Sequence, residues 1–576
     1  MGCRVGTARR GSIKAAAVTL AAFFGAVGPG ISPLIAVAQD EPRPPWAPPT
    51  NVASKPKDSG GPDTEYLKRV ECVTTATKGH QQVEADVIKD IPWGQAHLRL
   101  SEAHDYVRAK SRHGKIGVDE ASGKPLKVAV IDTGVTPHAF FQGRVKAGGD
   151  YVQKNGEGED GLLDCDGHGT QVAGIIGGNP NNPDVGFIGV APDIEIISIR
   201  QSSQNYSEKT EEEIEQERKE ATAKRKQAAD EARRKREAAE AQKRIDDLKR
   251  EVERSKNDDD SNGGSAAAGS PDGRTAPGQD GGQGDPRAQG NSSGAGNQET
   301  LAEAIVRAVD KHKVDVINMS VDACRPNSTG RTSQEAKLQA AIRHAVDEDV
   351  VVVAAAGNKG GSCQQNDTPA EDTGLMPDPN NPRTIVTPPW FSDDLLAVAA
   401  IDESGSVADF SMRGPWVSVA APGTKIISLD PARGSSALVN VMFNGESAEH
   451  IQGTSFASPY VAGLAALVRQ LHPDLDAREV MERIKTTAQH PGATGGHDQF
   501  IGYGVIDPMA ALTATLPSDI GADTAEDIAL PSDMPPPGGP DKTPMIVALA
   551  GSGGAIGALG ITLFVVHTIR RNRTAE

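Results

Sequence analysis

The sequence lacks an excess of basic residues. Lys and Arg number 60 against 78 Asp and Glu, so the 576-residue chain has a formal net charge of −18 at pH 7. Phosphate binding needs a basic face, so this balance argues against nucleic acid as a partner. Apolar residues are also few, at 37%, and the shortfall lies in polar low-complexity segments. The length leaves room for more than one domain.

Cysteine is scarce, and its spacing does not match a zinc site. Cys3 lies in a segment that we expect to be removed, which leaves Cys72, Cys165, Cys324 and Cys363. None resembles a nucleophile, and no clear acidic loop indicates calcium, so we expect no metal and no cofactor. Four cysteines in an oxidising compartment allow three pairings. We favour Cys72 with Cys165, and Cys324 with Cys363.

One serine is displayed at a predicted helix start. Residues 453–459 read Gly-Thr-Ser-Phe-Ala-Ser-Pro, and the alanine- and leucine-rich run 460–468 that follows predicts a buried helix. Ser455 therefore lies where backbone N–H groups have no partner within the helix and where the helix dipole favours negative charge. A serine there can attack a carbonyl, and the resulting oxyanion is stabilised beside it.

The groups that activate such a serine lie upstream. The apolar run 127–131 predicts a buried parallel strand with Asp132 at its carboxyl end, and His168 stands between two glycines at a predicted helix start. Histidine has the pKa of a general base, and an aspartate fixes its tautomer. A further strand, 350–356, ends near Asn358, whose amide can donate to the oxyanion beside the Ser455 N–H. Taken singly, each residue also fits a turn, cap or core role.

The motifs Asp-Thr-Gly at 132–134, His-Gly-Thr at 168–170 and Gly-Thr-Ser-Phe-Ala-Ser-Pro at 453–459 occur in this order, with Asn358 between the last two. Together they resemble the subtilisin family of serine proteases. The resemblance covers about residues 91–513 and implies a mostly parallel central sheet with helices on both faces, an α/β fold that the alternating strands and helices also predict. It implies that Asp132, His168 and Ser455 form a catalytic triad with Asn358 in the oxyanion hole. In the family, the strand ending near Ser320 forms a wall of the substrate cleft. Residues 322–324 here, Asp-Ala-Cys, depart from the common glycine-rich form, so the resemblance does not carry over the primary specificity pocket.

A long insertion interrupts the protease pattern at residues 201–298. Residues 207–256 are rich in Glu, Lys, Arg and Ala and contain no Gly or Pro, which predicts a helix that projects into solvent. Residues 257–297 are rich in Gly, Asp, Ser, Gln and Asn and are expected to be disordered. Disordered tips are where proteases cut, so self-cleavage in this loop is a hypothesis.

Both ends of the chain carry membrane signals. Basic residues precede an apolar run from 15 to 27 and a small-residue site at 36–38, which predicts a signal peptide over 1–38; an uncleaved anchor is the alternative. Residues 543–569 contain no Asp, Glu, Lys or Arg and are long enough to span a bilayer. The basic residues in 570–576 place that tail in the cytoplasm and the protease outside. A proline-rich linker over 514–542 joins the two.

The N-terminal extension, 39–90, is short for a propeptide that folds as its own domain. We expect it to lie against the protease surface, and the alternative is an inhibitory segment removed on activation. Together with the four mature cysteines, the single C-terminal helix and the long loop, it resembles the mycosins, membrane-bound subtilases of type VII secretion systems. That resemblance implies cleavage of exported protein substrates and association with the secretion complex. A structural subunit with secondary proteolysis remains the alternative.

Overall fold

A seven-stranded parallel sheet forms the centre of the computed structural model, which describes residues 46–72, 87–154, 156, 159–255, 294–367, 378, 380–444, 447–516 and 557–570. The strands lie in the order β12-β11-β9-β7-β2-β4-β3. All neighbouring pairs are parallel. The strands are β2 (Lys127–Asp132), β3 (Val145–Asp150), β4 (Glu195–Arg200), β7 (Val316–Met319), β9 (Val351–Ala355), β11 (Leu396–Ile401) and β12 (Val419–Pro422).

These strands form because they are short runs of β-branched and small apolar residues. Every residue of β7, β9, β11 and β12 is buried, as expected for a parallel sheet covered on both faces. The chain builds the sheet outward from β2 in both directions, because β2 pairs with β4 on one side and with β7 on the other. Open parallel sheets bind ligands at the carboxyl ends of the strands beside such a switch point.

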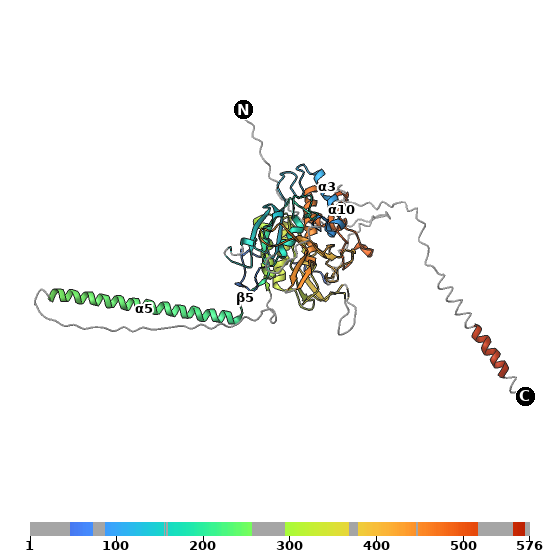
Figure 1. The fold of residues 1–576 in the computed structure, drawn as a ribbon. Coiled ribbons are helices and arrows are strands. Elements are labelled where there is room, and N and C mark those ends of the chain that lie inside the picture. The colour runs from blue at the N-terminus through green and yellow to red at the C-terminus, as the bar shows by residue number, and fades with distance from the viewer. Residues whose placement is uncertain are drawn as a thin grey trace, which may run out of the picture. The chain divides into compact units, whose positions relative to one another are not determined.

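Two pairs of helices cover the sheet. The helices α4 (His168–Gly177) and α8 (Thr454–Leu471) pack on each other, and so do α6 (Gln298–Arg307) and α7 (Ser333–Asp347). Because β2 contacts α4 and α6, and β9 contacts α8 and α7, the two pairs lie on opposite faces. The subtilisin-like α/β architecture predicted from the sequence is confirmed (Figure 1).

Smaller elements complete this part of the chain. The helices are α2 (Trp93–His97), α3 (Leu100–Lys110), α9 (Ala477–Thr486) and α10 (Pro508–Thr513), and a π-helical segment, Ala308–His312, continues α6. The two-stranded antiparallel pairs are β8 (Ala323–Pro326) with β10 (Thr384–Thr387), β13 (Ser428–Leu429) with β14 (Leu438–Val439), and β15 (Val441–Asn444) with β16 (Ser447–His450).

The described part of the N-terminal extension contacts the protease fold along much of its length. Asp58 accepts hydrogen bonds from Tyr151 Oη at 2.7 Å and from Arg307 at 3.0 Å, and Lys55 pairs with Asp310 at 2.7 Å. Further on, β1 (Tyr66–Lys68) joins a three-stranded antiparallel sheet with β5 (Ser203–Glu208) and β6 (Gly294–Ala295). These contacts agree with an extension that lies on the protease surface. Residues 73–86 lie outside the described part of the chain.

The insertion is connected to the fold by two strands that the sequence analysis did not predict. The strands β5 and β6 lie inside residues 201–298 and are held together by the sheet they form with β1. Arg69, just after β1, forms two hydrogen bonds of 2.6 and 2.7 Å with the Glu213 carboxylate near the start of the inserted helix. The alternating hydrophobic pattern that normally marks a strand is missing from β5, because its sequence, SQNYSE, is mostly polar.

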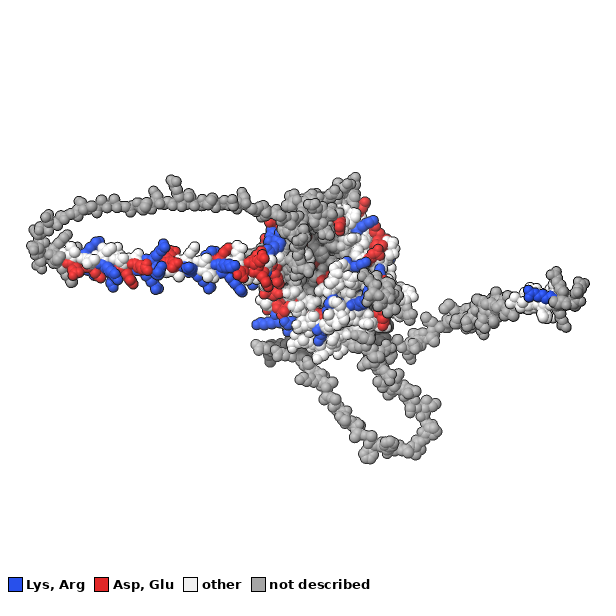
Figure 2. Space-filling model, turned by 90° about the horizontal axis from the view of Figure 1, so that it is seen from below, with Lys and Arg blue, Asp and Glu red and all other residues white. Residues whose placement is uncertain are grey.

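Between these strands runs α5 (Glu211–Ser255), a single uninterrupted helix of 45 residues (Figure 1). Its side chains are almost all exposed, and acidic and basic groups alternate along it (Figure 2). Ion pairs one turn apart, such as Glu215 with Lys219 and Glu231 with Lys235, support it in place of a buried face. The predicted solvent-exposed helix is therefore present, although residues 207–208 of its predicted range belong to β5. The expected disordered segment lies outside the described residues up to 293, and the prediction is wrong for residues 294–297, which form β6 and the cap of α6.

The C-terminal segment is described only in part. Residues 557–570 are helical, whereas the rest of the predicted span over 543–569 lies outside the described residues. Among the helices described, none combines the length and the apolar character needed to cross a bilayer. The predicted signal peptide over 1–38 and the linker over 517–542 also lie outside this part of the chain.

Candidate active site

The predicted acid and base meet at the switch point of the sheet. Asp132 is the last residue of β2, and His168 is the first residue of α4. Nδ1 of His168 lies 2.7 Å from Oδ1 of Asp132, which also accepts a 2.7 Å hydrogen bond from the Thr133 N–H. Asp132 is fully buried, while the His168 side chain keeps 20% of its surface exposed. A buried carboxylate thus holds one edge of a ring whose other edge is accessible.

Glycines on both sides of His168 are required by the geometry. Gly167 caps α4 with a φ of 85°, a left-handed conformation that glycine adopts at little cost. A Cβ on Gly169 would lie 2.1 Å from the carbonyl oxygen of Gly134, next to the Asp132 strand end. The helix can therefore approach the strand closely enough for the 2.7 Å contact only because this position has no side chain.

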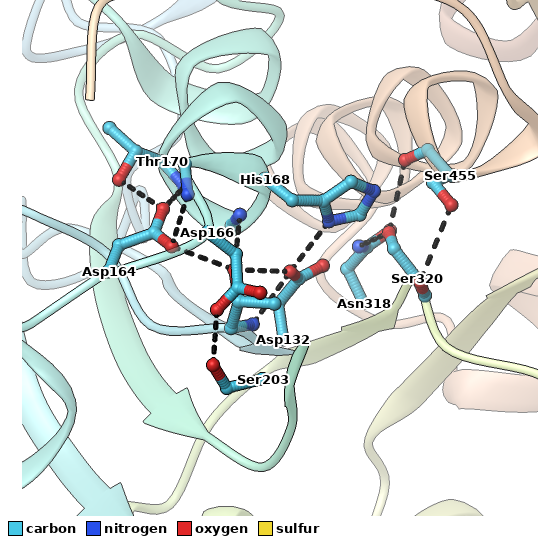
Figure 3. Close-up of polar contacts among 12 residues, drawn as sticks. Asp132, Asp164, Asp166, His168, Thr170, Ser203, Asn318, Ser320 and Ser455 are labelled. Atoms are coloured by element: carbon cyan, nitrogen blue, oxygen red, sulfur yellow. Dashed lines mark hydrogen bonds and ion pairs between the residues drawn. The ribbon is translucent and has the colours of Figure 1, made fainter. Parts of the chain in front are cut away.

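Ser455 faces the same site from the first turn of α8 (Figure 3). The residue is 7% exposed, and its Oγ donates a 3.4 Å hydrogen bond to the carbonyl oxygen of Ser320. The ring of the next residue, Phe456, lies 5.0 Å from the His168 ring between centroids. The structure shows no Ser455–His168 hydrogen bond, but such contacts are often loose before substrate binds.

The amide of Asn358 is oriented by the serine helix. Its Oδ1 accepts hydrogen bonds from the N–H of Thr454 at 3.0 Å and from the Thr454 hydroxyl at 3.2 Å. With the oxygen so engaged, the NH2 group points away from Thr454, and no described residue accepts a hydrogen bond from it. The strand β9 and the helix α8 thus place an amide donor beside the Ser455 N–H at the helix start.

A buried carboxylate that the sequence analysis missed braces the acid and the base. Asp164 accepts hydrogen bonds from the Thr133 hydroxyl at 2.8 Å, the Gly167 N–H at 2.8 Å, and the N–H and hydroxyl of Thr170 at 2.8 and 2.6 Å. The two threonines belong to the Asp-Thr-Gly and His-Gly-Thr motifs, which is the one signal that could have pointed to this network. Nothing local marks Asp164 itself.

A second missed contact ties the histidine loop to the insertion. Asp166 accepts hydrogen bonds from the Ser203 hydroxyl at 2.5 Å and the Gln204 N–H at 2.6 Å, at the start of β5 (Figure 3). Burial raises the pKa of Asp166 to about 6. The strand that leads into α5 therefore contacts the loop two residues before His168.

The cysteines are joined as Cys72–Cys165 and Cys324–Cys363, the pairing favoured from the sequence. The first disulfide fastens the extension three residues before His168. Asp322 lies near the sulfurs of the second, a grouping of a kind that can hold a metal ion. Because both sulfurs are bonded to each other, they offer no thiolate, and this group does not fit a metal site.

Comparison with known proteins decides the family. Residues 123–504 match the model of the subtilase family, peptidase S8. Mycosin-1 of Mycobacterium tuberculosis (strain H37Rv) is 34% identical over 520 residues, which cover 90% of this chain and 91% of the relative. The chain belongs to the subtilases and, within them, to the mycosins.

Solved mycosin structures share the fold. The crystal structure of MycP1 from Mycobacterium smegmatis matches with a TM-score of 0.57 and 31% identity, covering 82% of this chain and 95% of that one. A chain of the intact ESX-5 inner membrane complex matches with a TM-score of 0.57 and 31% identity, covering 91% of this chain and all of that one. This mycosin is accordingly a serine endopeptidase.

The electrostatic environment of His168 in this mycosin favours the protonated ring. Burial lowers the pKa of His168, but the charge and hydrogen bond of Asp132, together with the charges of Asp164 and Asp166, outweigh it, so the pKa is raised above 6.5. A ring that accepts a proton readily is suited to general base catalysis near neutral pH.

Peptide hydrolysis by this mycosin should rise with pH and reach half its maximum above pH 6.5. Only neutral His168 can accept the serine proton, so activity is lost as pH falls through its raised pKa. The measurement is the pH dependence of kcat/KM. Asp166→Asn removes a negative charge that raises this pKa, so its midpoint should lie at lower pH than that of the wild type. A wild-type midpoint below 6.5, or an upward shift in the variant, would contradict this account.

Asn358→Ala should lower kcat by about 10²–10³-fold with little change in KM, because an oxyanion donor acts mainly in the transition state. Single-turnover and steady-state kinetics on one peptide measure both constants. Thr454→Val serves as a companion variant. Losing its hydroxyl removes one of the two contacts to Asn358 Oδ1 and the acceptor of the Gly357 N–H, but keeps the Thr454 N–H contact, so its effect should be smaller. A raised KM with an unchanged kcat for Asn358→Ala would argue for a binding role instead.

Proposed function

We propose that this mycosin is anchored to the cytoplasmic membrane and cleaves exported proteins on its outer side, as part of type VII secretion. The observation that carries the proteolytic part is the 2.7 Å contact of Asp132 with His168 at the site that Ser455 faces. The membrane part is supported by the apolar stretch 543–569 and its basic tail. Relatives described as parts of the ESX-5 inner membrane complex and its periplasmic assembly support the secretion part.

We assign the catalytic roles residue by residue. Ser455 Oγ attacks the scissile carbonyl carbon while His168 Nε2 takes its proton. Asp132 accepts the Nδ1–H hydrogen bond, holds this tautomer and stabilises the imidazolium. The Asn358 amide and the Ser455 N–H bind the oxyanion. His168 then returns the proton to the leaving amine, and water hydrolyses the acyl-enzyme by the same sequence of steps.

The domain organisation belongs to the same proposal. Residues 1–38 are a signal peptide, 39–90 an extension held on the protease, 91–513 the protease with its insertion at 201–298, 514–542 a linker, 543–569 a membrane helix and 570–576 a cytoplasmic tail. The contacts of Asp58 and Arg69 and the Cys72–Cys165 bond support a retained extension over one that dissociates. Disulfide bonds also agree with a location outside the cytoplasm.

The test uses a chemical probe that reports both the reactive serine and the side of the membrane on which the protease lies. A fluorophosphonate that phosphonylates nucleophilic serines, supplied as a membrane-impermeant form to intact cells, should label the wild type and not Ser455→Ala. Labelling that requires cell lysis would place the protease inside and overturn the topology. Absence of labelling in lysed cells as well would overturn the proposed catalytic assignment.

A second candidate function is support of the secretion complex without chemistry. It is favoured by the exposed helix α5, which makes no described contact with the catalytic residues. It is also favoured by the relatives that occur within membrane complexes. Complementation of a deletion strain separates the two functions. If Ser455→Ala restores secretion, assembly is the main role, and if it restores none, proteolysis is required.

A further inference from the structure

A single carboxylate lies between the two segments that hold the reacting groups. Asp322 is two residues after Ser320, whose carbonyl oxygen accepts the Ser455 hydroxyl hydrogen bond. On its other side, Oδ2 of Asp322 would be 3.2 Å from a Cβ placed on Gly357, the residue before Asn358. The carboxylate therefore lies beside the backbone that leads to the oxyanion donor.

The position of Asp322 is fixed by its surroundings. The next residues form β8, which pairs with β10 through Ala323 and Thr387 and through Cys324 and Val386. The Cys324–Cys363 disulfide holds the same segment, and Sγ of Cys363 lies 3.8 Å from Oδ2 of Asp322. Asp322 directly precedes a strand held in this way, so its backbone should stay in place when substrate binds.

The charge of Asp322 has no counter-ion in the described part of the chain. The residue is exposed, and no described Lys, Arg or His side chain forms an ion pair with it. Protein atoms close around the carboxylate raise its pKa to about 6, and the nearby His168 opposes this rise. The group is therefore largely ionised at neutral pH. An accessible but crowded acid beside reacting groups is typical of a functional position.

The placement over Gly357 indicates which substrate side chain it meets. When the scissile carbonyl oxygen lies at Asn358 and the Ser455 N–H, the side chain of the residue that supplies this carbonyl projects from the adjacent Cα. Gly357 itself is closely packed, since a Cβ there would lie 2.8 Å from Cγ1 of Val386 and 3.2 Å from Oδ2 of Asp322. Asp322 is exposed beside this backbone, so a long cationic side chain that projects from the adjacent Cα would pair with its carboxylate.

We propose that Asp322 is a specificity-determining residue that selects substrates with lysine or arginine immediately N-terminal to the scissile bond. This inference rests on the proposed proteolytic function and adds the substrate class to it. An acidic residue at the same substrate position meets repulsion instead, so the site discriminates by charge in both directions.

The test uses the full-length protein in detergent and three peptides that differ only at this position, with Lys, Gln or Glu. The wild type should cleave the Lys peptide with the highest kcat/KM and the Glu peptide with the lowest. Asp322→Asn should reduce the Lys-to-Gln ratio of kcat/KM about tenfold. Asp322→Lys should reverse the order of Lys and Glu. Asp474→Asn, a change at an exposed acid outside the site, should alter no ratio.

Each outcome bears on the inference separately from the proposed function. An unchanged Lys-to-Gln ratio in Asp322→Asn overturns the inference while leaving the protease assignment standing. An equal loss on all three peptides also overturns it, because it indicates a structural role for Asp322. If no peptide is cleaved in a Ser455-dependent manner, the proposed function fails and the inference fails with it.

Discussion

Ser455→Ala should abolish peptide hydrolysis, with kcat lower by on the order of 10⁶-fold. The residue lies in the first turn of α8, where no other hydroxyl is placed to replace it: the Thr454 hydroxyl contacts Asn358 and that of Ser458 contacts Ser320. The loss should appear in kcat, since alanine leaves the substrate contacts intact. The measurement is hydrolysis of a peptide of known cleavage site by purified protein.

The matched control for this change is Ser458→Ala, one turn further along the same buried helix. Its hydroxyl lies 3.2 Å from that of Ser320 and has no contact with His168. We expect it to keep activity within about tenfold, the range of an indirect packing or hydrogen-bond effect. Hydrolysis by Ser455→Ala within tenfold of the wild type would remove Ser455 from the mechanism.

Asp132→Asn should lower kcat by about 10⁴-fold while the fold is kept. The asparagine has nearly the same shape, but its NH2 group can face Nδ1 of His168 and turn that atom into an acceptor. The proton then resides on Nε2, which can no longer take the serine proton. The measurement is kcat over a range of pH.

Two further readouts distinguish this explanation from unfolding. The melting temperature of Asp132→Asn should stay close to that of the wild type, because Asp164 continues to hold Thr133, Gly167 and Thr170. The acid limb of the pH profile should move to lower pH, because the Asp132 charge that raises the pKa of His168 is gone. A loss of kcat smaller than tenfold would argue that Asp132 does not orient the ring.

Much of the candidate site could be predicted because each motif is local. Asp132 follows a β-branched run, His168 stands between glycines, and Ser455 precedes an alanine-rich helix, so each carries its own signal within about ten residues. The helix α5 was predictable for the same reason, since helix propensity and one-turn ion pairs act over short distances. The residues predicted at strand ends and helix starts meet in the structure because the parallel strands of the sheet all end at the same edge.

Other features depend on contacts between distant segments. The strands β1, β5 and β6 are polar or only two to three residues long. They form because an ion pair joins the extension to the insertion, while a disulfide holds the extension beside the histidine loop. The position of Asp164 depends on hydrogen-bond donors from Thr133, Gly167 and Thr170, and the position of Asp322 depends on its approach to Gly357. No periodic pattern in the sequence indicates which distant residues come into contact.

By itself the sequence determined the chemistry of this protein, because a nucleophile, a base, an acid and an amide donor each need a particular residue in a particular local setting. Only the tertiary structure decided which hydrogen bonds hold those groups, how the insertion contacts the histidine loop and where the Asp322 carboxylate lies. These depend on packing across the sheet edge, where atoms from segments more than thirty residues apart meet, and packing of that kind is a property of the folded chain as a whole.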